Sequence, residues 1–164
     1  MGSRSGDLDP AIPLYMIRQL GIPAEEVDFI LNQQSGLLGI SGKNDMRCIL
    51  QLDADKHINA SLAIDMFVYR INTIVGSYIA VMDELDAIIF TGGIGEHATP
   101  IREKILEGFS LRLRIFIDEE KNQTLSSHGN EGVISHSDSE TEVWVIPTNE
   151  EWQIAQQASK LLNQ

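Results

Sequence analysis

Residues 90–97 read Phe-Thr-Gly-Gly-Ile-Gly-Glu-His, and this stretch decides the fold because it joins a strand to a helix. The apolar run at 85–90 is typical of a short buried strand. Farther on, Thr99 and Pro100 predict a helix with Thr99 as its N-cap and Pro100 at its first position. Glycines let the backbone approach an anion, and free N–H groups at a helix start bind it. The stretch therefore predicts a phosphate site of a nucleotide-binding protein.

Length and charge limit the kinds of partner. The 164 residues are enough for one ordinary domain with its own core. The formal net charge is −12, which argues against nucleic acid or an anionic membrane surface as the main partner. A bound phosphate therefore has to be held by local backbone N–H groups and a few arginines.

Cysteine content and hydropathy indicate the cellular setting. Cys48 is the one cysteine, so no intrachain disulfide can form, which fits a reducing cytoplasm. We expect Cys48 to be a buried thiol without chemistry. No stretch of the sequence is apolar and long enough to span a membrane, and the polar start of the chain predicts no signal peptide.

The remaining pattern places helices first and strands later, which indicates an α/β protein. Expected helices cover 10–20, 23–31, a short stretch after Asp45, 59–82, 99–108 and a final segment from Thr148 or Asn149; expected strands cover 85–91, 114–118, 132–135 and 142–147. The helix at 59–82 is apolar around most of its circumference, so we expect it to be largely buried. Residues 35–42 read as a packed glycine loop and residues 119–131 as a polar excursion. Thr148 and Glu151 are spaced as a capping box for the last helix.

The glycine stretch alone permits two simpler interpretations. One is a tight turn that binds nothing, since short glycine motifs are weak signals. The other is a dinucleotide site: residues 93–98 match G-x-G-x-x-A, and Asp118 follows at an expected strand end where an acid can bind ribose. Against this, Glu96 would place a carboxylate beside the pyrophosphate, and the chain lacks a second βαβ half.

Four stretches together resemble the acetate kinase family, including its propionate and butyrate relatives. Residues 1–10 (Met-Gly-Ser-Arg-Ser-Gly-Asp-Leu-Asp-Pro) are similar to the segment with the family's catalytic arginine. Residues 35–42 (Ser-Gly-Leu-Leu-Gly-Ile-Ser-Gly), followed by residues 45–47 (Asp-Met-Arg), resemble its next block. Residues 91–96 (Thr-Gly-Gly-Ile-Gly-Glu) match its nucleotide loop, and residues 145–151 (Val-Ile-Pro-Thr-Asn-Glu-Glu) match its C-terminal block.

The resemblance implies a ribonuclease-H-like mixed sheet with helices, as in the sugar-kinase, actin and heat-shock-chaperone superfamily. It covers only the C-terminal half of the family chain, so residues 1–164 are expected to form its single C-terminal nucleotide-binding domain. The implied reaction is reversible transfer of the ATP γ-phosphate to acetate or another short-chain carboxylate, giving an acyl phosphate and ADP, with Mg²⁺ or Mn²⁺. A cytoplasmic homodimer without nucleic-acid or membrane partners is expected.

The acyl pocket and further catalytic residues of the family belong to the half that this sequence does not resemble. We therefore expect the isolated chain to be inactive, because the carboxylate cannot be held in line with the γ-phosphate. The resemblance covers acetate, propionate and butyrate alike as the carboxylate. A non-catalytic nucleotide-binding or dimerisation module is the other expectation, with the helix at 59–82 offering an apolar patch.

The resemblance assigns roles residue by residue. Arg4 is implied as the catalytic stabiliser of the transferring phosphoryl group, which suits a planar guanidinium. Glu150 is implied as the magnesium-linked carboxylate. The implied nucleotide-binding residues are Asp45, Met46, Arg47, Gly93, Ile94, Gly95, Glu96 and His97.

His97 departs from the family pattern, which usually has asparagine at this position. Histidine still donates a hydrogen bond, but it is bulkier and titrates near neutral pH. The three other histidines, His57, His128 and His136, fall outside the motifs and are expected at the surface or in loops.

Overall fold

The computed structural model describes residues 2–128 and 130–162. Contacts group the chain into two units, one up to Thr73 and one from Ile74 onward, with the boundary inside a long helix. The single domain expected over residues 1–164 stays a prediction.

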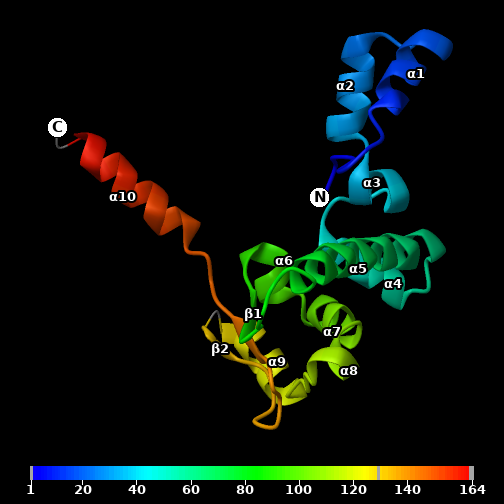
Figure 1. Ribbon diagram of the computed structural model, residues 1–164. Coiled ribbons are helices and arrows are strands. Elements are labelled where there is room, and N and C mark those ends of the chain that lie inside the picture. Colours follow the sequence, from blue (N-terminus) through cyan, green and yellow to red (C-terminus); the bar gives the residue numbers. More distant parts are fainter. Residues whose placement is uncertain (1, 129, 163–164) are drawn as a thin grey trace. The chain divides into compact units, whose positions relative to one another are not determined.

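The first unit is helical (Figure 1). Its helices are α1 (Ala11–Gln19), α2 (Ala24–Gln33), α3 (Gly36–Ser41), α4 (Met46–Ala54) and the first part of α5 (Ile58–Ile79). Side chains of short polar residues hold two of the helix starts. Asp9 accepts the Ala11 N–H at 2.8 Å, and Asp45 accepts the Arg47 N–H at 2.9 Å. The helices expected near 10–20, 23–31 and after Asp45 are thereby confirmed.

Three expectations for this unit are wrong. Residues 36–41 are a helix rather than a loop, with Gly36 and Gly42 in the left-handed region at its two ends. Cys48 is exposed. The long helix α5 exists, but its buried residues are only Ala60, Ala63 and Ile64, so it is not largely buried.

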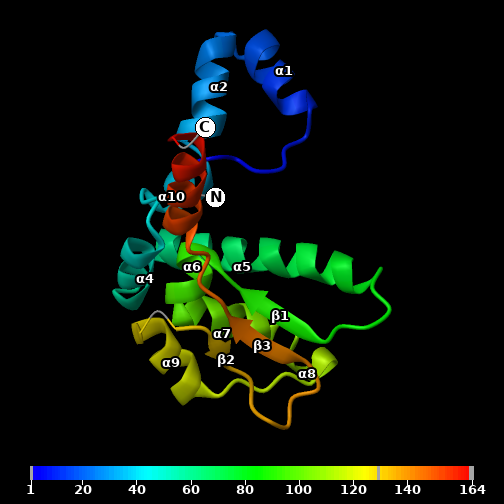
Figure 2. The same ribbon diagram turned by 90° about the vertical axis from the view of Figure 1, so that its left-hand side faces the viewer.

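The second unit contains a mixed three-stranded sheet in the order β1-β3-β2, with β1 (Ala87–Phe90), β2 (Gly132–Val133) and β3 (Glu142–Val145). The strands β1 and β3 are parallel, with Phe90 opposite Val145, whereas β2 is antiparallel to β3. Helices α7 (Thr99–Glu107), α8 (Ser110–Leu113) and α9 (Glu119–His128) lie between β1 and β2 in sequence (Figure 2). This arrangement confirms the predicted α/β class with a mixed sheet.

The core of this unit lies on one face of the sheet. Val143 and Val145 are buried, while Glu142, the first residue of β3, is exposed and Trp144 is half-buried, as the twofold strand period requires. The cluster consists of Leu106, Ile115, Ile134, Val143 and Val145, with Ile88, Phe90, Leu113, Ile117 and Leu125 packed against it. Residues of α7 and α9 therefore cover the sheet that carries the glycine segment.

Several expected elements of this unit differ from the observed ones. Residues 114–118 form one isolated bridge, Ile117 with Ser135, instead of a strand, and Arg114 is left-handed at φ 48°. The polar excursion is the helix α9. The helix α7 is preceded by Ala98 as N-cap instead of Thr99.

The ends of the glycine segment and of the chain also differ from expectation. Residues Gly92–His97 form a short helix, α6, rather than an open loop. The last helix, α10, covers Glu150–Leu162, and the hydroxyl of Thr148 bonds elsewhere than in a capping box. Among the described residues, no helix has both the length and the apolar character to cross a membrane.

We predict that Ile134→Ala lowers the free energy of unfolding of the second unit by about 2–5 kcal/mol, because it leaves a cavity beside the sheet. Ile134 is fully buried. Both tryptophans, Trp144 and Trp152, lie in this unit, so urea denaturation followed by tryptophan fluorescence measures the loss. The control Leu111→Ala, at a side chain that is 97% exposed, should stay within about 0.5 kcal/mol of wild type. Equal effects of the two substitutions would contradict the assigned core.

Candidate functional site

The candidate site lies at the edge of the sheet where the parallel strands β1 and β3 both end. The glycine segment follows β1, and residues 146–150 follow β3. The two exits are held together by a hydrogen bond from the Ile146 N–H to the Phe90 carbonyl, at 2.9 Å. Figure 2 shows the arrowheads of both strands at the edge where α6 begins. In open α/β sheets, ligands bind outside the carboxyl ends of strands, so this edge is the expected place for one.

Glu96 connects the two segments that leave this edge. Its Oε1 atom accepts hydrogen bonds from the Gly92 N–H at 2.8 Å, the Thr148 N–H at 3.0 Å and the Thr148 hydroxyl at 3.1 Å. The side chain is only 14% exposed. The carboxylate therefore points into its own protein and joins the start of α6 to the segment before α10.

These hydrogen bonds also set the ionisation of Glu96. Burial alone would raise its pKa, but the hydrogen bonds from Thr148 and Gly92 together outweigh burial, so the pKa of Glu96 lies below its ordinary value. The bonds consequently stabilise the fold above the ordinary glutamate pKa of about 4.3, and the stabilisation is lost as the pH falls through the lower folded value. At neutral pH the carboxylate is ionised.

Arg102 of α7 supports the glycine segment from inside. Its side chain is fully buried, and one guanidinium nitrogen donates to the carbonyls of Gly95 and Glu96 at 2.7 and 2.9 Å. The other two nitrogens donate to the side-chain and main-chain oxygens of Asn122 in α9, at 2.7 and 2.8 Å. Asn122 is itself buried and donates to Glu103 at 2.9 Å. Burial lowers the pKa of Arg102, which remains protonated because guanidinium groups titrate far above neutral pH.

The glycines of the segment differ in what they permit. Gly92 has φ +72°, a left-handed conformation that other L-residues adopt at a cost. A Cβ at Gly95 would lie 3.4 Å from the Phe90 backbone, so a methyl group just fits and a larger side chain meets the strand. A Cβ at Gly93 would meet nothing within 4 Å. Since a Cβ at Gly92 would also meet nothing within 4 Å, the backbone is open to an approaching ligand at both Gly92 and Gly93.

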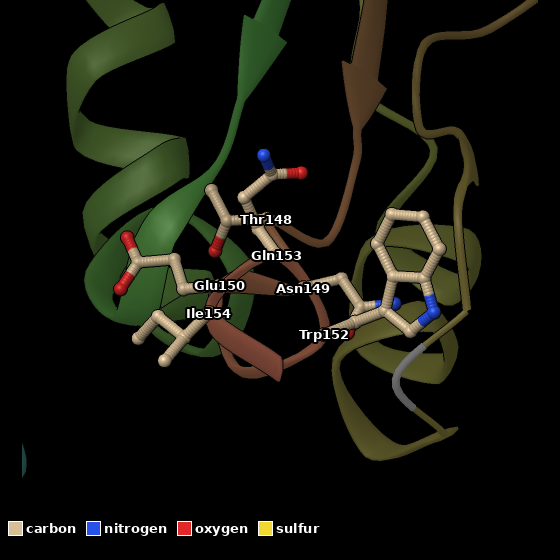
Figure 3. Close-up of a pocket in the computed structure, with 6 residues that line it drawn as sticks. All are labelled: Thr148, Asn149, Glu150, Trp152, Gln153 and Ile154. Carbon is tan, nitrogen blue, oxygen red and sulfur yellow. The ribbon is translucent and has the colours of Figure 1, made fainter. Parts of the chain in front are cut away.

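Glu150 opens the helix α10 beside an open pocket of about 640 Å³. The pocket is lined by Thr148, Asn149, Glu150, Trp152, Gln153 and Ile154. Figure 3 shows Glu150 and Trp152 pointing to opposite sides of the helix start. Asn149 takes a left-handed conformation at φ 46°, which asparagine tolerates better than most residues. This turn separates the anchored Thr148 from the exposed carboxylate of Glu150.

The start of α10 offers a metal the exposed carboxylates of Glu150 and its neighbour Glu151, rather than a cage. Within residues 2–128 and 130–162, no group of three or more His, Cys, Asp or Glu side chains could hold a metal ion. Magnesium in phosphate-transferring sites is commonly bound by one or two carboxylates together with phosphate oxygens and water. Glu150 therefore fits a metal that arrives with the nucleotide.

Arg4 lies in the first unit with its backbone pinned on both sides. The carbonyls of Gly2 and Ser3 accept N–H groups of Leu38 and Ser35 at 2.9 and 2.8 Å. The Ser5 N–H donates to Leu31 at 2.8 Å. The exposed side chain of Arg4 thus extends from an anchored segment instead of a frayed end.

The Asp45–Arg47 block also lies in the first unit, at the start of α4. The two charged side chains form an exposed ion pair at 2.6 Å, in which the hydrogen bond from the Arg47 side chain lowers the pKa of Asp45 to about 2. The side chain of Arg47 is 87% exposed. Met46 is buried, so its side chain packs inside the unit, whereas Arg47 and, to a lesser extent, Asp45 reach solvent.

The structure thus brings together residues 93–97 and the segment that carries Glu150 in the second unit, while Arg4 and the block at 45–47 belong to the first unit. His97 is 58% exposed, with its Nε2 atom 4.0 Å from a Glu96 oxygen. His57 and His136 are exposed as predicted, and the side chain of His128 lies outside the described part of the structure. The assigned binding roles stay predictions.

The sequence reasoning missed Arg102, Asn122 and Thr148 as parts of this site. Arg102 lies in the predicted helix at 99–108, where an arginine is expected on the solvent-exposed face. Asn122 lies in the stretch 119–131, which the sequence predicts to be a polar excursion. Thr148 was assigned to a capping box, whereas its hydroxyl donates to Glu96.

Comparison with known proteins agrees with this geometry. The family model described as the acetokinase family matches residues 1–156. The chain belongs to the acetokinase family. It is 41% identical to an acetate kinase from a Sulfurovum species over 99% of this chain and 41% of that protein. It is 45% identical to an acetate kinase from a Shewanella species over 99% of this chain and 40% of that protein.

Solved structures give the same result for this acetokinase-family chain. The crystal structure of Porphyromonas gingivalis acetate kinase matches with a TM-score of 0.84 and 37% identity, covering 99% of this chain and 40% of that one. A propionate kinase from Francisella tularensis matches with a TM-score of 0.83 and 44% identity, over 95% of this chain and 39% of that one. The fold is thus that of the sugar-kinase, actin and heat-shock-chaperone group.

The chain spans about 40% of the length of the curated relatives it matches. None of the relatives above supports the dinucleotide interpretation. Asp118, which that interpretation placed at a strand end, instead accepts the N–H of Lys121 at 3.1 Å at the start of α9.

We predict that Arg102→Met lowers the free energy of unfolding of the second unit by about 2–4 kcal/mol, because it leaves several buried oxygens without their donor. Urea denaturation followed by tryptophan fluorescence is the measurement. The control Arg112→Met removes an exposed arginine from α8 and should change the free energy by less than about 0.5 kcal/mol. A loss no greater than that of the control would show that the buried guanidinium does not support the glycine segment.

Proposed function

We propose that this chain forms the nucleotide side of an acetokinase-family phosphotransferase. In this proposal, the γ-phosphate of ATP is transferred reversibly to acetate or another short-chain carboxylate, giving an acyl phosphate and ADP. The observation that carries the proposal is the glycine segment at the shared edge of β1 and β3, tied by Glu96 to the segment that carries Glu150.

Each proposed contact uses a feature of the described residues. The N–H of Gly92 is taken by Glu96, but the open backbone at Gly93 lets phosphate oxygens come close to the N–H groups that follow it in the first turn of α6, which have no main-chain partner within the helix. Ile94, Gly95 and His97 continue the same surface, with His97 as a donor toward the nucleoside. In the first unit, the side chain of Arg47 is exposed, and its proposed ligand is the adenine. The side chain of Arg4 extends from an anchored segment, and its proposed ligand is the transferring phosphoryl group.

Magnesium or manganese fits the proposal as a nucleotide-borne ion near Glu150. When bound, such an ion neutralises part of the charge on the phosphates. Glu150 is exposed at the first turn of α10 and offers one carboxylate for this purpose.

The acceptor carboxylate is not assigned to residues of this chain. Relatives named acetate kinase and propionate kinase both match it over nearly all of its length. We infer that the chain alone does not complete the reaction, since phosphoryl transfer needs the acceptor held in line. A cytoplasmic setting is proposed with this activity.

A homodimer is also proposed, and the helix α5 supports it. Ile58, Leu62, Met66 and Tyr69 are spaced along one face of α5, with exposed fractions of 82, 49, 51 and 74%. An apolar row of this kind is typical of surfaces that bind another protein.

We predict that the chain binds Mg-ATP and that Gly93→Val weakens the affinity by about tenfold or more, because the side chain occupies open space that the phosphates need. Isothermal titration calorimetry measures the affinity. The matched control is Gly76→Val in α5, where a Cβ also meets nothing within 4 Å, and it should bind like wild type. Binding of NAD in place of ATP, or equal affinities of the two variants, would overturn the assigned nucleotide site.

We predict that the chain sediments as a dimer and that Met66→Lys shifts it toward monomer, weakening association by about tenfold or more through a charge in an apolar contact. Sedimentation velocity over a range of concentrations measures this. Leu111→Lys, at a side chain that is 97% exposed in α8, is the control and should leave the association unchanged. A wild-type chain that stays monomeric at high concentration argues against the dimer.

A further inference from the structure

We infer that Glu96 is a positioning residue. It forms hydrogen bonds within the chain that fix the position of Glu150, and it does not contact the nucleotide or its metal. This inference rests on the proposed function, because it assigns Glu96 a different task in the same site. The sequence motif places Glu96 among the nucleotide contacts, whereas the structure directs its Oε1 atom to three donors of the chain.

The three hydrogen bonds join two segments that leave the sheet separately. Gly92 begins α6 directly after β1, and Thr148 precedes α10 after β3. In this part of the second unit, the strands are paired only as far as the bond between Ile146 and Phe90. Beyond that bond, the side chain of Glu96 connects the two segments through its hydrogen bonds to Gly92 and Thr148.

The connection reaches Glu150 through a short and restricted path. Thr148 is held by both its N–H and its hydroxyl, so its backbone and side chain are fixed together. One residue follows, Asn149, in a left-handed conformation that few residues adopt. The direction in which Glu150 leaves the turn is therefore set from the Glu96 carboxylate.

The anchor of Glu96 is itself fixed. Its main-chain carbonyl accepts from the buried guanidinium of Arg102 at 2.9 Å. The side chain is 14% exposed, so water competes little with the three donors. To bring its Oε1 atom to the nucleotide, the carboxylate would have to leave these three donors and turn toward negatively charged phosphates.

Two substitutions at Glu96 separate positioning from direct contact. Glu96→Gln keeps an oxygen that accepts hydrogen bonds but removes the charge, and Glu96→Ala removes both. Glu107→Gln, at an exposed carboxylate of α7, controls for the loss of one negative charge. The measurements are amide hydrogen exchange of Gly92 and Thr148, the amide resonance of Glu150 by NMR, and Mg-ATP titration of the 164-residue chain.

In Glu96→Ala, we expect the amides of Gly92 and Thr148 to exchange about tenfold faster or more, the Glu150 resonance to shift, and the Mg-ATP affinity to fall about tenfold. Glu96→Gln should restore all three to within about threefold of wild type. Unchanged exchange in Glu96→Ala would overturn the inference. So would an equal loss of affinity in both variants with unchanged amides, since the charge would then act on the ligand itself.

The exchange and resonance measurements need no nucleotide, so they decide the positioning role even if the chain binds no Mg-ATP. In that case the proposed nucleotide site of the isolated chain fails, while the connection from Glu96 to Glu150 stands or falls on the amides alone.

Discussion

The buried guanidinium of Arg102 is the interaction on which the described site depends. It joins the end of α6 to α9 by donating to carbonyls of the first and to Asn122 of the second. A charge without water is tolerated only when its donors are satisfied, and here each of its three nitrogens has an acceptor. The glycine segment has few side chains that could pack, so these hydrogen bonds from Arg102 fix the position of its backbone.

That support makes the next interaction possible. With its carbonyl held by Arg102, Glu96 presents its carboxylate to Gly92 and Thr148 from a fixed backbone. Two charged side chains thus order the glycine segment: Arg102 binds its main-chain carbonyls, and Glu96 connects it to Thr148 across the sheet edge. The glycines let the backbone come close to a ligand, and the hydrogen bonds of these two charged side chains fix a glycine-rich backbone that would otherwise be flexible.

The sequence predicts those features that depend on neighbours along the chain. The helix after Asp45, the short strand that covers 87–90 and the long helix α5 follow from local spacing, and the structure confirms them. Where tertiary contacts decide, prediction fails. The helix α3 is not predicted because residues 36–42 contain three glycines and glycine is a poor helix former, and α9 is not predicted because it is polar except at Leu125.

The same distinction applies to the site. The motif at 91–96 identified where a ligand is expected, but it could not distinguish Glu96 as a ligand contact from Glu96 as an internal acceptor. That difference lies in Thr148, which is far away in sequence and adjacent only because β1 and β3 are parallel. Arg102 was equally hidden, since arginines are rarely fully buried and its acceptors are carbonyls, which every sequence contains.

Charge at the sheet edge explains why such an acidic chain can still offer a place for phosphates. At physiological ionic strength, charges farther than about 8 Å apart are largely screened, so the net charge of −12 matters less than the groups at the edge itself. There, Glu96 is the carboxylate that belongs to the glycine segment, and its Oε1 atom is turned toward Gly92 and Thr148. The hydrogen bonds that order the segment therefore also turn the negative charge of Glu96 toward the protein interior. This orientation lowers the electrostatic repulsion between Glu96 and an incoming phosphate.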